Sequence, residues 1–484
     1  MVKDKKISKE GLTVKKADDF SEWYQQLMIK GELADYTKVS GCIALRPRSQ
    51  WIWEKFVRFT DDLFEKSGIE NVNFPLLIPE SLLVKEADHV EGFVPEVAWV
   101  THAGNKKLNE RLAIRPTSEA IIYDSYAKWI RSHNDLPMRY NQWGNVVRWE
   151  FNNPVPFFRT REFQWNEGHS VFASEKEAKA EADDILGMYD KAVGSMMALP
   201  SVRGFKTEKE KFAGAISSEK LHYMTHSGRV IEGPCFHYDG QNFSKAYDIK
   251  FTREDQKEDY VYQNTWAVST RMLGVMFTIH SDDKGLVIPP RLSRNKVVIV
   301  PILFDDSKEE VLKKVGELKK ELKVFGPLTD LREDVSPGRK FNGWELKGIP
   351  LRIELGPKDL EKGAVVITKR NTGDKVEVKF KDLKKRVSEL LEEMQGELYD
   401  SAKELLEKKT KKSSDKDEMV KLVKEKNMVS VPMCKNEKCE DGLKEIMPGL
   451  KTLFVDSKGG SVEGEKCVVC EKKAEYWVYV GRTY

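Results

Sequence analysis

Hydrophobic residues recur at helical or strand-like spacing along most of the chain, and the rhythm changes between regions. Helices are predicted over 49–68, 118–132 and 173–199. Strands are predicted over 72–78, 146–151, 161–172 and 244–251, the first of them interrupted by Pro75. Because these strands and helices do not alternate strictly, the first 295 residues are predicted to form an antiparallel α+β body.

The pattern changes after Pro289 and Pro290. A buried strand is predicted over 296–303, strands over 351–355 and 364–368, and helices over 308–322 and 383–398. This alternation predicts a compact α/β domain of the parallel type. A polar run over 408–417 is typical of a linker or an exposed helix end. We therefore predict three domains, over 1–295, 296–405 and 406–484.

Composition narrows the class of protein. The length of 484 residues suits about three domains. The 81 Lys and Arg nearly balance the 78 Asp and Glu, so any polyanion must be bound by locally clustered charge. The apolar run over 297–304 is far shorter than the roughly 20 residues that span a bilayer. The first thirty residues lack the apolar core of a secretory signal. We expect a cytoplasmic protein that does not bind membranes.

The cysteines are unevenly distributed, because four of the six lie in the last 51 residues. Cys434 and Cys439 form one close pair, and Cys467 and Cys470 form another after 27 intervening residues. Two such pairs can present four thiolates to one tetrahedral zinc ion. The alternative is four unrelated buried thiols, but the clustering favours zinc. No histidine lies nearby, so we interpret the site as structural.

Charged and aromatic residues share one face of the strand predicted over 161–172. Alternation places Arg161, Phe163, Trp165, Glu167 and His169 on that face. The alternative is a solvated, salt-bridged sheet, but the aromatic residues favour a ligand cavity. Arginine binds phosphate oxygens and an aromatic ring stacks on a base, so the set suits a nucleoside triphosphate together with an amino acid. The chain has no GxxxxGK[ST] sequence, which excludes a P-loop.

Three segments resemble the degenerate motifs of class II aminoacyl-tRNA synthetases. The helix and strand ending near Pro75 resemble motif 1, which forms the dimer interface. Residues 148–150 and 159–163 resemble motif 2, and residues 269–271 with the apolar stretch that follows resemble motif 3. More specific are the sequences at 115–119, 160–169, 210–214, 240–244, 337–342 and 481–484. From about residue 18 to the end, the chain resembles the prolyl-tRNA synthetases of the archaeal/eukaryotic-like type.

The resemblance implies a fold and an activity. The expected fold class is α+β: a class II antiparallel-sheet catalytic domain, then an α/β anticodon-binding domain and a small α/β zinc-binding C-terminal domain. The expected enzyme is a ligase that joins L-proline to tRNA(Pro) through prolyl-adenylate, releasing AMP and diphosphate. Its expected cofactors are ATP and Mg²⁺ for catalysis and Zn²⁺ for structure. A homodimer is expected as well.

The resemblance also assigns roles to individual residues, with Arg148 and Arg271 as the catalytic pair. The residues expected to bind the amino acid are Thr117, Glu119, Arg148, Trp165, Glu167, His169, Phe212, His237 and Ser269. Those expected to bind ATP are Arg148, Glu150, Arg159, Phe163, Glu232, Ser269 and Arg271. Those expected to bind the anticodon are Arg339, Phe341, Glu345 and Lys369. The final residue, Tyr484, is expected to reach toward the catalytic domain.

Several alternatives stay open at this point. Residues 117–119 also suit a capped helix N-terminus, and His237 also suits a hydrogen-bonded core position. Glu232 and Cys235 depart from the glutamine and the Thr-Ser-His run common in the family. The chain as a whole could be a synthetase for threonine, histidine or glycine, or an inactive paralogue that binds RNA. The presence of Arg148, Arg159 and Arg271 argues against an inactive protein.

Overall fold

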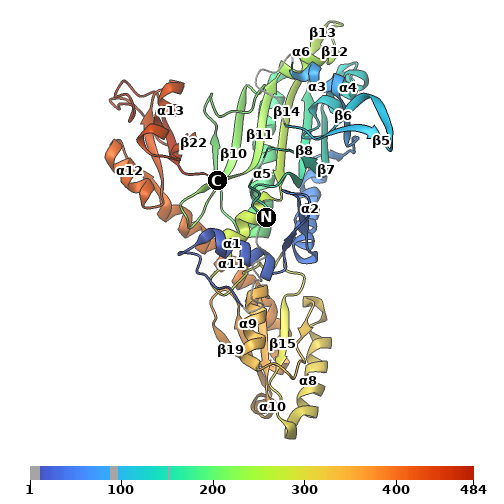
Figure 1. Ribbon diagram of the computed structural model, residues 1–484, viewed down its shortest axis with the longest axis vertical. Coiled ribbons are helices and arrows are strands. Elements are labelled where there is room, and N and C mark those ends of the chain that lie inside the picture. The colour runs from blue at the N-terminus through green and yellow to red at the C-terminus, as the bar shows by residue number, and fades with distance from the viewer. Residues whose placement is uncertain (1–10, 88–95, 151–152, 484) are drawn as a thin grey trace.

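The computed structural model describes residues 11–87, 96–150 and 153–483, and shows three parts around the long helix α11 (Leu383–Lys409) (Figure 1). The part predicted to be catalytic (the catalytic part) lies at the top of the view, the part predicted to bind the anticodon (the anticodon-binding part) at the bottom and the C-terminal part at the left. The predictions that concern Phe151 and Tyr484 fall outside the described residues. None of the helices in the described ranges is long and apolar enough to cross a membrane.

The catalytic part contains both helices and strands in irregular order. Its helices are α1 (Phe20–Lys30), α2 (Pro47–Lys66), α3 (Glu80–Ala87), α4 (Glu119–Trp129), α5 (Glu175–Ala192), α6 (Asn242–Tyr247) and α7 (Arg271–His280). Its strands are β1 (Ala34–Tyr36), β2 (Ile43–Leu45), β3 (Glu70–Asn71), β4 (Leu77–Pro79), β5 (Trp99–Ala103), β6 (Lys106–Ile114), β7 (Met138–Val147), β8 (Glu162–Phe172), β9 (Val202–Phe205), β10 (Ser217–Met224), β11 (Val230–Gly240), β12 (Lys250–Thr252), β13 (Glu258–Tyr260) and β14 (Tyr262–Ser269).

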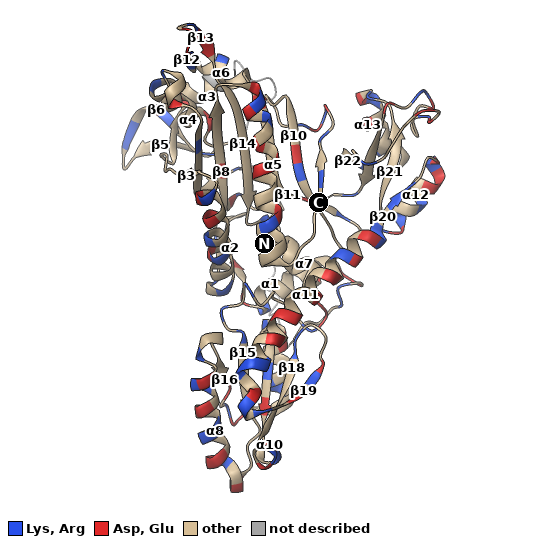
Figure 2. Cartoon of the chain, turned by 180° about the vertical axis from the view of Figure 1, so that it is seen from behind, with Lys and Arg blue, Asp and Glu red and all other residues tan. Residues whose placement is uncertain are grey.

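The other two parts are smaller. Besides α11, the anticodon-binding part contains β15 (Val297–Pro301), α8 (Lys308–Glu321), β16 (Leu328–Thr329), α9 (Pro337–Lys347), β17 (Leu351–Leu355), α10 (Pro357–Lys362), β18 (Ala364–Lys369) and β19 (Lys375–Lys379). The C-terminal part contains β20 (Thr410–Lys412), α12 (Lys416–Lys424), β21 (Met428–Met433), α13 (Glu437–Ile446), β22 (Lys451–Val455) and β23 (Tyr476–Gly481). Basic and acidic residues interleave along α8 and α11 (Figure 2), in keeping with the balanced net charge.

One eleven-stranded sheet links the catalytic and C-terminal parts, in the order β20-β21-β23-β22-β9-β10-β11-β14-β8-β7-β3. The strands from β9 to β7 pair antiparallel, so the predicted α+β catalytic fold is confirmed. Helix α5 packs across β10, β11, β14 and β8. Its Glu181 accepts hydrogen bonds from Ser170 and Asn264 at 2.8 Å. Because side chains alternate along a strand, His169 and Thr265 must lie on the opposite face.

Three predicted strands are wrong in part or in whole. Residues 72–78 pair only near their ends, because Pro75 has no N–H and the N–H of Phe74 bonds to the side chain of Gln142. The strand predicted over 146–151 ends at Val147, since the N–H of Trp149 donates to Glu96 outside the β7–β8 ladder. Residues 244–251 form the end of α6 and the start of β12 instead. There Phe243 and Tyr247 are buried four residues apart, which is helical spacing.

The sheet of the anticodon-binding part is mixed rather than parallel. Strand β15 pairs parallel with β16 and β17, but β18 is antiparallel to both β17 and β19. Only residues 356–363 connect β17 to β18. A parallel crossover needs about a dozen residues or more, so this connection requires an antiparallel return. The prediction of an α/β domain is confirmed, and the prediction that its sheet is parallel is wrong.

Candidate functional site

A cavity of about 240 Å³ lies on the face of the sheet opposite α5. The cavity lining includes twelve of the residues predicted to bind the amino acid or ATP, namely Thr117, Glu119, Arg148, Phe163, Trp165, Glu167, His169, Phe212, Glu232, His237, Ser269 and Arg271. They come from the start of α4, the end of β7, strands β8, β11 and β14, the loop after β9, and the start of α7. Segments far apart in the sequence therefore converge on one cavity.

Strand β8 supplies one wall of this cavity through alternate residues. Phe163, Trp165, Glu167 and His169 all line the cavity, as the alternation predicts. Arg161, predicted on the same face, does not line it, because the residue precedes β8. Its guanidinium lies 4.2 Å from the ring centroid of Trp149 and donates to the carbonyl of Ser40 at 3.1 Å.

Glu167 is a buried carboxylate at the floor of the cavity. It accepts hydrogen bonds from the N–H of Ser118 at 3.0 Å and from Gln142 Nε2 at 2.9 Å, and also from the Ser118 hydroxyl. Burial favours a higher pKa, but hydrogen bonds from His169 and Ser118 outweigh it and hold the pKa of Glu167 below its usual value. Ser118 is the N-cap residue of α4, yet its side chain bonds to Glu167 and not to the helix backbone.

Thr117 and Glu119 form a polar pair beside Glu167. Both side chains are buried, and the Thr117 hydroxyl donates to the Glu119 carboxylate. A hydroxyl and a carboxylate side by side can together accept two N–H donors. The pair is therefore suited to a ligand with a secondary ammonium group.

Two arginines give the cavity a cationic side. Arg148 Nε donates to the carbonyl of Pro116 at 3.0 Å, and its guanidinium lies 5.2 Å from the Trp165 ring centroid. Arg271 begins α7 and is largely enclosed. Burial lowers the pKa of Arg271, while the nearby Glu232 opposes the shift. An arginine stays charged under such shifts, so both side chains can bind an anion.

Glu232 does not add an uncompensated negative charge to the cavity. Its carboxylate lies 2.8 Å from Lys206 Nζ and 2.6 Å from Lys220 Nζ. Burial favours a higher pKa, but the charges of Lys220 and Lys206 hold the pKa of Glu232 well below its usual value. The group of three side chains therefore has a net charge of about +1.

His237 is both a lining residue and a hydrogen-bonded one. Its Nδ1 lies 2.7 Å from Ser218 Oγ, and its ring centroid lies 4.7 Å from that of Phe212. Burial lowers the pKa of His237 to about 3, so the imidazole is neutral near pH 7. Both interpretations of this residue from the sequence are therefore compatible with the structure.

The structure leaves two predicted residues outside the cavity lining and adds others. Glu150 and Arg159 are exposed and do not line it. Lys220, Glu210 and Thr265 line it but were not predicted. Glu210 stands in a recognised motif and could have been found there, whereas an isolated lysine in the middle of β10 gives no signal in the sequence.

Comparison with known proteins matches all three parts of the chain. A family model of the tRNA synthetase class II core domain (G, H, P, S and T) matches residues 99–280, and an anticodon-binding domain model matches residues 296–390. A model described as "Prolyl-tRNA synthetase, C-terminal" matches residues 416–484. The chain is 44% identical to a "Proline--tRNA ligase" of Natranaerobius thermophilus over 94% of each chain. This chain belongs to the prolyl-tRNA synthetase family.

Other relatives are similar to this chain over nearly their full length. A "Proline--tRNA ligase" of Clostridium novyi is 41% identical, over 96% of this chain and 97% of the relative. A "Proline--tRNA ligase, cytoplasmic" of Arabidopsis thaliana is 41% identical, over 100% of this chain and 93% of the relative. The resemblance found in the sequence motifs is thus confirmed at the level of the family.

The residues predicted to bind the anticodon come from one helix and one strand of the anticodon-binding part. Arg339, Phe341 and Glu345 are on α9, and Lys369 ends β18. Arg339 is exposed, whereas Glu345 accepts a hydrogen bond from Arg352 at 3.0 Å and Lys369 Nζ donates to Glu397 at 2.5 Å. Glu345 and Lys369 thus each have a partner within the protein, and each keeps further acceptor or donor positions beyond that bond.

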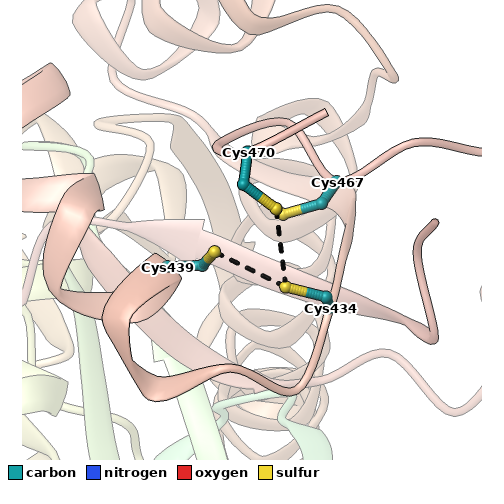
Figure 3. A group of neighbouring side chains, drawn as sticks. All are labelled: Cys434, Cys439, Cys467 and Cys470. Atoms are coloured by element: carbon teal, nitrogen blue, oxygen red, sulfur yellow. Dashed lines mark hydrogen bonds between the residues drawn. The ribbon is translucent and has the colours of Figure 1, made fainter. Parts of the chain in front are cut away.

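The four cysteines of the C-terminal domain meet at one point (Figure 3). Their Sγ atoms all lie within 4.8 Å of one another, and the Sγ of Cys434 is 3.5 Å from that of Cys439 and 3.8 Å from that of Cys470. Four sulfurs at about 2.3 Å from a tetrahedral zinc ion are about 3.8 Å apart, so the cluster fits zinc. In the described ranges this is the one group of three or more His, Cys, Asp or Glu able to hold a metal.

Proposed function

We propose that this chain attaches proline to tRNA in two steps, with prolyl-adenylate as the intermediate. The observation that supports this most is the single cavity in which a hydroxyl–carboxylate pair, an aromatic wall and two arginines converge. The matching catalytic, anticodon-binding and C-terminal family models, together with relatives named proline--tRNA ligase, support the same activity. The chain would therefore act as an ATP-dependent ligase.

The amino acid would lie on the Thr117 side of the cavity. The Thr117 hydroxyl and the Glu119 carboxylate would accept the two N–H groups of the proline ammonium. The ring would pack within a wall formed by Trp165, Glu167, His169, Phe212 and His237. Ser269 at the end of β14 would be shared between the amino acid and ATP.

ATP would lie on the arginine side of the cavity. Arg148 would bind the α-phosphate and the amino acid carboxylate, and Arg159 and Arg271 would bind the terminal phosphates. Phe163 and Arg271 would enclose the adenine, with Glu150 and Glu232 as further contacts. A proline carboxylate oxygen would attack the α-phosphorus and diphosphate would leave. The terminal ribose hydroxyl of tRNA would then attack the carbonyl carbon of the adenylate and release AMP. Positioning and charge stabilisation suffice for such steps.

Two metals complete the proposal. Mg²⁺ would enter with ATP, because it binds substrate phosphates and usually keeps several waters. Zn²⁺ would be held by Cys434, Cys439, Cys467 and Cys470 and would stabilise the C-terminal domain. The four cysteine ligands leave a tetrahedral ion no open position for catalysis.

We further infer a homodimer that works in the cytoplasm. Leu76 and Leu77 are 48% and 39% exposed in the segment that resembles motif 1, and exposed adjacent apolar residues favour an interface. The word "cytoplasmic" in the name of the Arabidopsis relative supports the location. Light scattering should give about twice the monomer mass of 55.7 kDa; a monomer would contradict the dimer.

The proposed function is tested by charging tRNA(Pro) with labelled proline. Label should appear on the tRNA only when enzyme, ATP and Mg²⁺ are all present. An anticodon-substituted tRNA(Pro) should accept less label if residues 296–405 bind the anticodon. Charging with threonine in place of proline, or no charging of any tRNA, would contradict the proposal.

A further inference from the structure

A buried carboxylate of the C-terminal domain contacts the segment that forms part of the cavity wall. This pocket segment comprises residues 206–212, of which Glu210 and Phe212 line the cavity. The Thr207 hydroxyl donates to Glu440 Oε2 at 2.8 Å, and the hydroxyl of Thr452 donates to the same oxygen at 2.7 Å. All three side chains are buried. A hydrogen bond to a carboxylate is stronger than a neutral one, so this contact is a firm link between the two domains.

Lys206 makes a second contact between the same two regions. Its Nζ donates to the carbonyl of Leu453 on β22 at 2.7 Å and to Glu232 in the cavity lining at 2.8 Å. The Lys206 side chain is only 1% exposed. One ammonium group therefore connects the backbone of the C-terminal domain with a side chain of the cavity.

The strands beneath these contacts are in close register. Phe205 at the end of β9 pairs with Val455 of β22, which joins the strands of the two domains into one sheet. A Cβ at Gly204 would lie 2.2 Å from the ring of Phe454, so only glycine permits this approach. The Phe454 ring in turn stacks on His222, with centroids 4.1 Å apart. The start of the pocket segment is therefore fixed against the C-terminal domain.

The other end of the pocket segment is fixed against the catalytic sheet. The N–H of Phe212 donates to Ser218 Oγ at 2.9 Å, and that oxygen also contacts His237. The C-terminal domain thus holds the segment at Thr207, and also through the ion pairs of Lys209 with Asp441 and of Glu210 with Lys451, the latter at 3.4 Å. The catalytic sheet holds it at Phe212. A shift at Thr207 would move Glu210 and Phe212 relative to the rest of the cavity.

We propose that Glu440 is a positioning residue for amino acid binding: through Thr207 it sets the place of the pocket segment, and so the fit of the amino acid against Phe212. Glu440 does not line the cavity and contacts the pocket segment through the Thr207 hydroxyl. The proposal rests on the proposed function, since it takes proline as the ligand beside Phe212. The C-terminal domain would then contribute to the binding of the amino acid through Glu440.

The chain offers a matched pair of variants for the test. Thr207→Val and Thr452→Val each remove one buried hydroxyl donor from the same Glu440 oxygen, but only Thr207 belongs to the pocket segment. Thr207→Val should raise the KM for proline about tenfold in proline-dependent pyrophosphate exchange, with a smaller change in kcat. Thr452→Val should leave the KM for proline within about twofold of the wild type, and Thr207→Ser should restore it.

Equal KM values for proline in the two valine variants would overturn the inference, because Glu440 would then serve structure alone. A loss of kcat in Thr207→Val with unchanged KM for proline would overturn it too. If Thr207→Val does not fold, Glu440→Leu decides, because leucine has no acceptor oxygen for the Thr207 hydroxyl. A raised KM for proline with unchanged KM for ATP supports the inference, and an unchanged KM for proline overturns it. Wild-type enzyme that shows no exchange with proline would instead contradict the proposed function.

Discussion

Replacing Arg148 by alanine is expected to stop amino acid activation while leaving the fold largely intact. The side chain is anchored by one hydrogen bond from Nε to Pro116 and by the rings of Phe163 and Trp165, whose centroids are 5.6 and 5.2 Å from the guanidinium. An arginine has five N–H donors, so this anchor leaves terminal nitrogens available for an anion in the cavity. The substitution therefore removes a charge that we propose binds the reacting groups.

The two consequences of Arg148→Ala differ in size. Losing one net hydrogen bond costs about 1 kcal/mol, and losing the cation–π contacts costs about 1 kcal/mol more. A domain stable by about 5–15 kcal/mol tolerates this. Losing a fixed donor to the charge that develops in the transition state typically lowers the rate by about 10²–10³, or about 3–4 kcal/mol. The effect on the rate should thus exceed the effect on the free energy of unfolding.

ATP–pyrophosphate exchange with proline measures the first effect, and urea unfolding measures the second. Arg161→Ala is a matched control, because Arg161 also lies over an aromatic ring and donates to a backbone carbonyl but does not line the cavity. The control should keep exchange within about threefold of the wild type. Exchange by Arg148→Ala at the wild-type rate, or an equal loss in both variants, would refute the assignment.

Three further predictions concern packing, protonation and metal. Gly204→Ala should lower the free energy of unfolding by about 1–3 kcal/mol, because the new Cβ meets the Phe454 ring. Gly316→Ala, in an open helical position, should raise the free energy of unfolding slightly. Equal effects of the two substitutions in urea unfolding would contradict this. Burial lowers the pKa of His237 to about 3, so between pH 6.5 and 3 only the unfolded chain binds this proton, and the folded state loses stability as the pH falls. In His237→Gln the loss of stability from pH 6 to pH 5 should be smaller by about 1.2 kcal/mol, and an unchanged loss would place the pKa elsewhere. Metal analysis should find about one zinc per chain and little in Cys467→Ser; equal zinc in both would contradict the cluster.

Much of the fold follows from local periodicity. The apolar spacing over 49–68, 118–132 and 308–322 predicts helices that the structure has within a few residues. Residues 244–251 could not be assigned in this way, because eight residues satisfy either period. The burial of Phe243 and Tyr247 against Tyr123 of α4 favours the helix. The antiparallel direction of β18 could not be predicted from its own residues, because it depends on the short connection from β17 to β18.

The site could be predicted from the sequence where its residues belong to one motif or alternate along one strand. The four lining residues of β8 follow directly from alternation, as does their convergence on one face. The partners of Glu232 could not be predicted from the sequence, because Lys206 and Lys220 are single lysines on a loop and a strand that the sheet brings together. The link from Glu440 to Thr207 spans 233 residues of sequence, and only the pairing of β9 with β22 makes it visible.

Pyrophosphate exchange across all the standard amino acids tests whether the cavity activates proline. We expect ATP- and Mg²⁺-dependent exchange that is greatest with proline and requires Arg148. Exchange with threonine, histidine or glycine but not with proline would contradict it. Absence of exchange with every amino acid from a folded protein would contradict it as well.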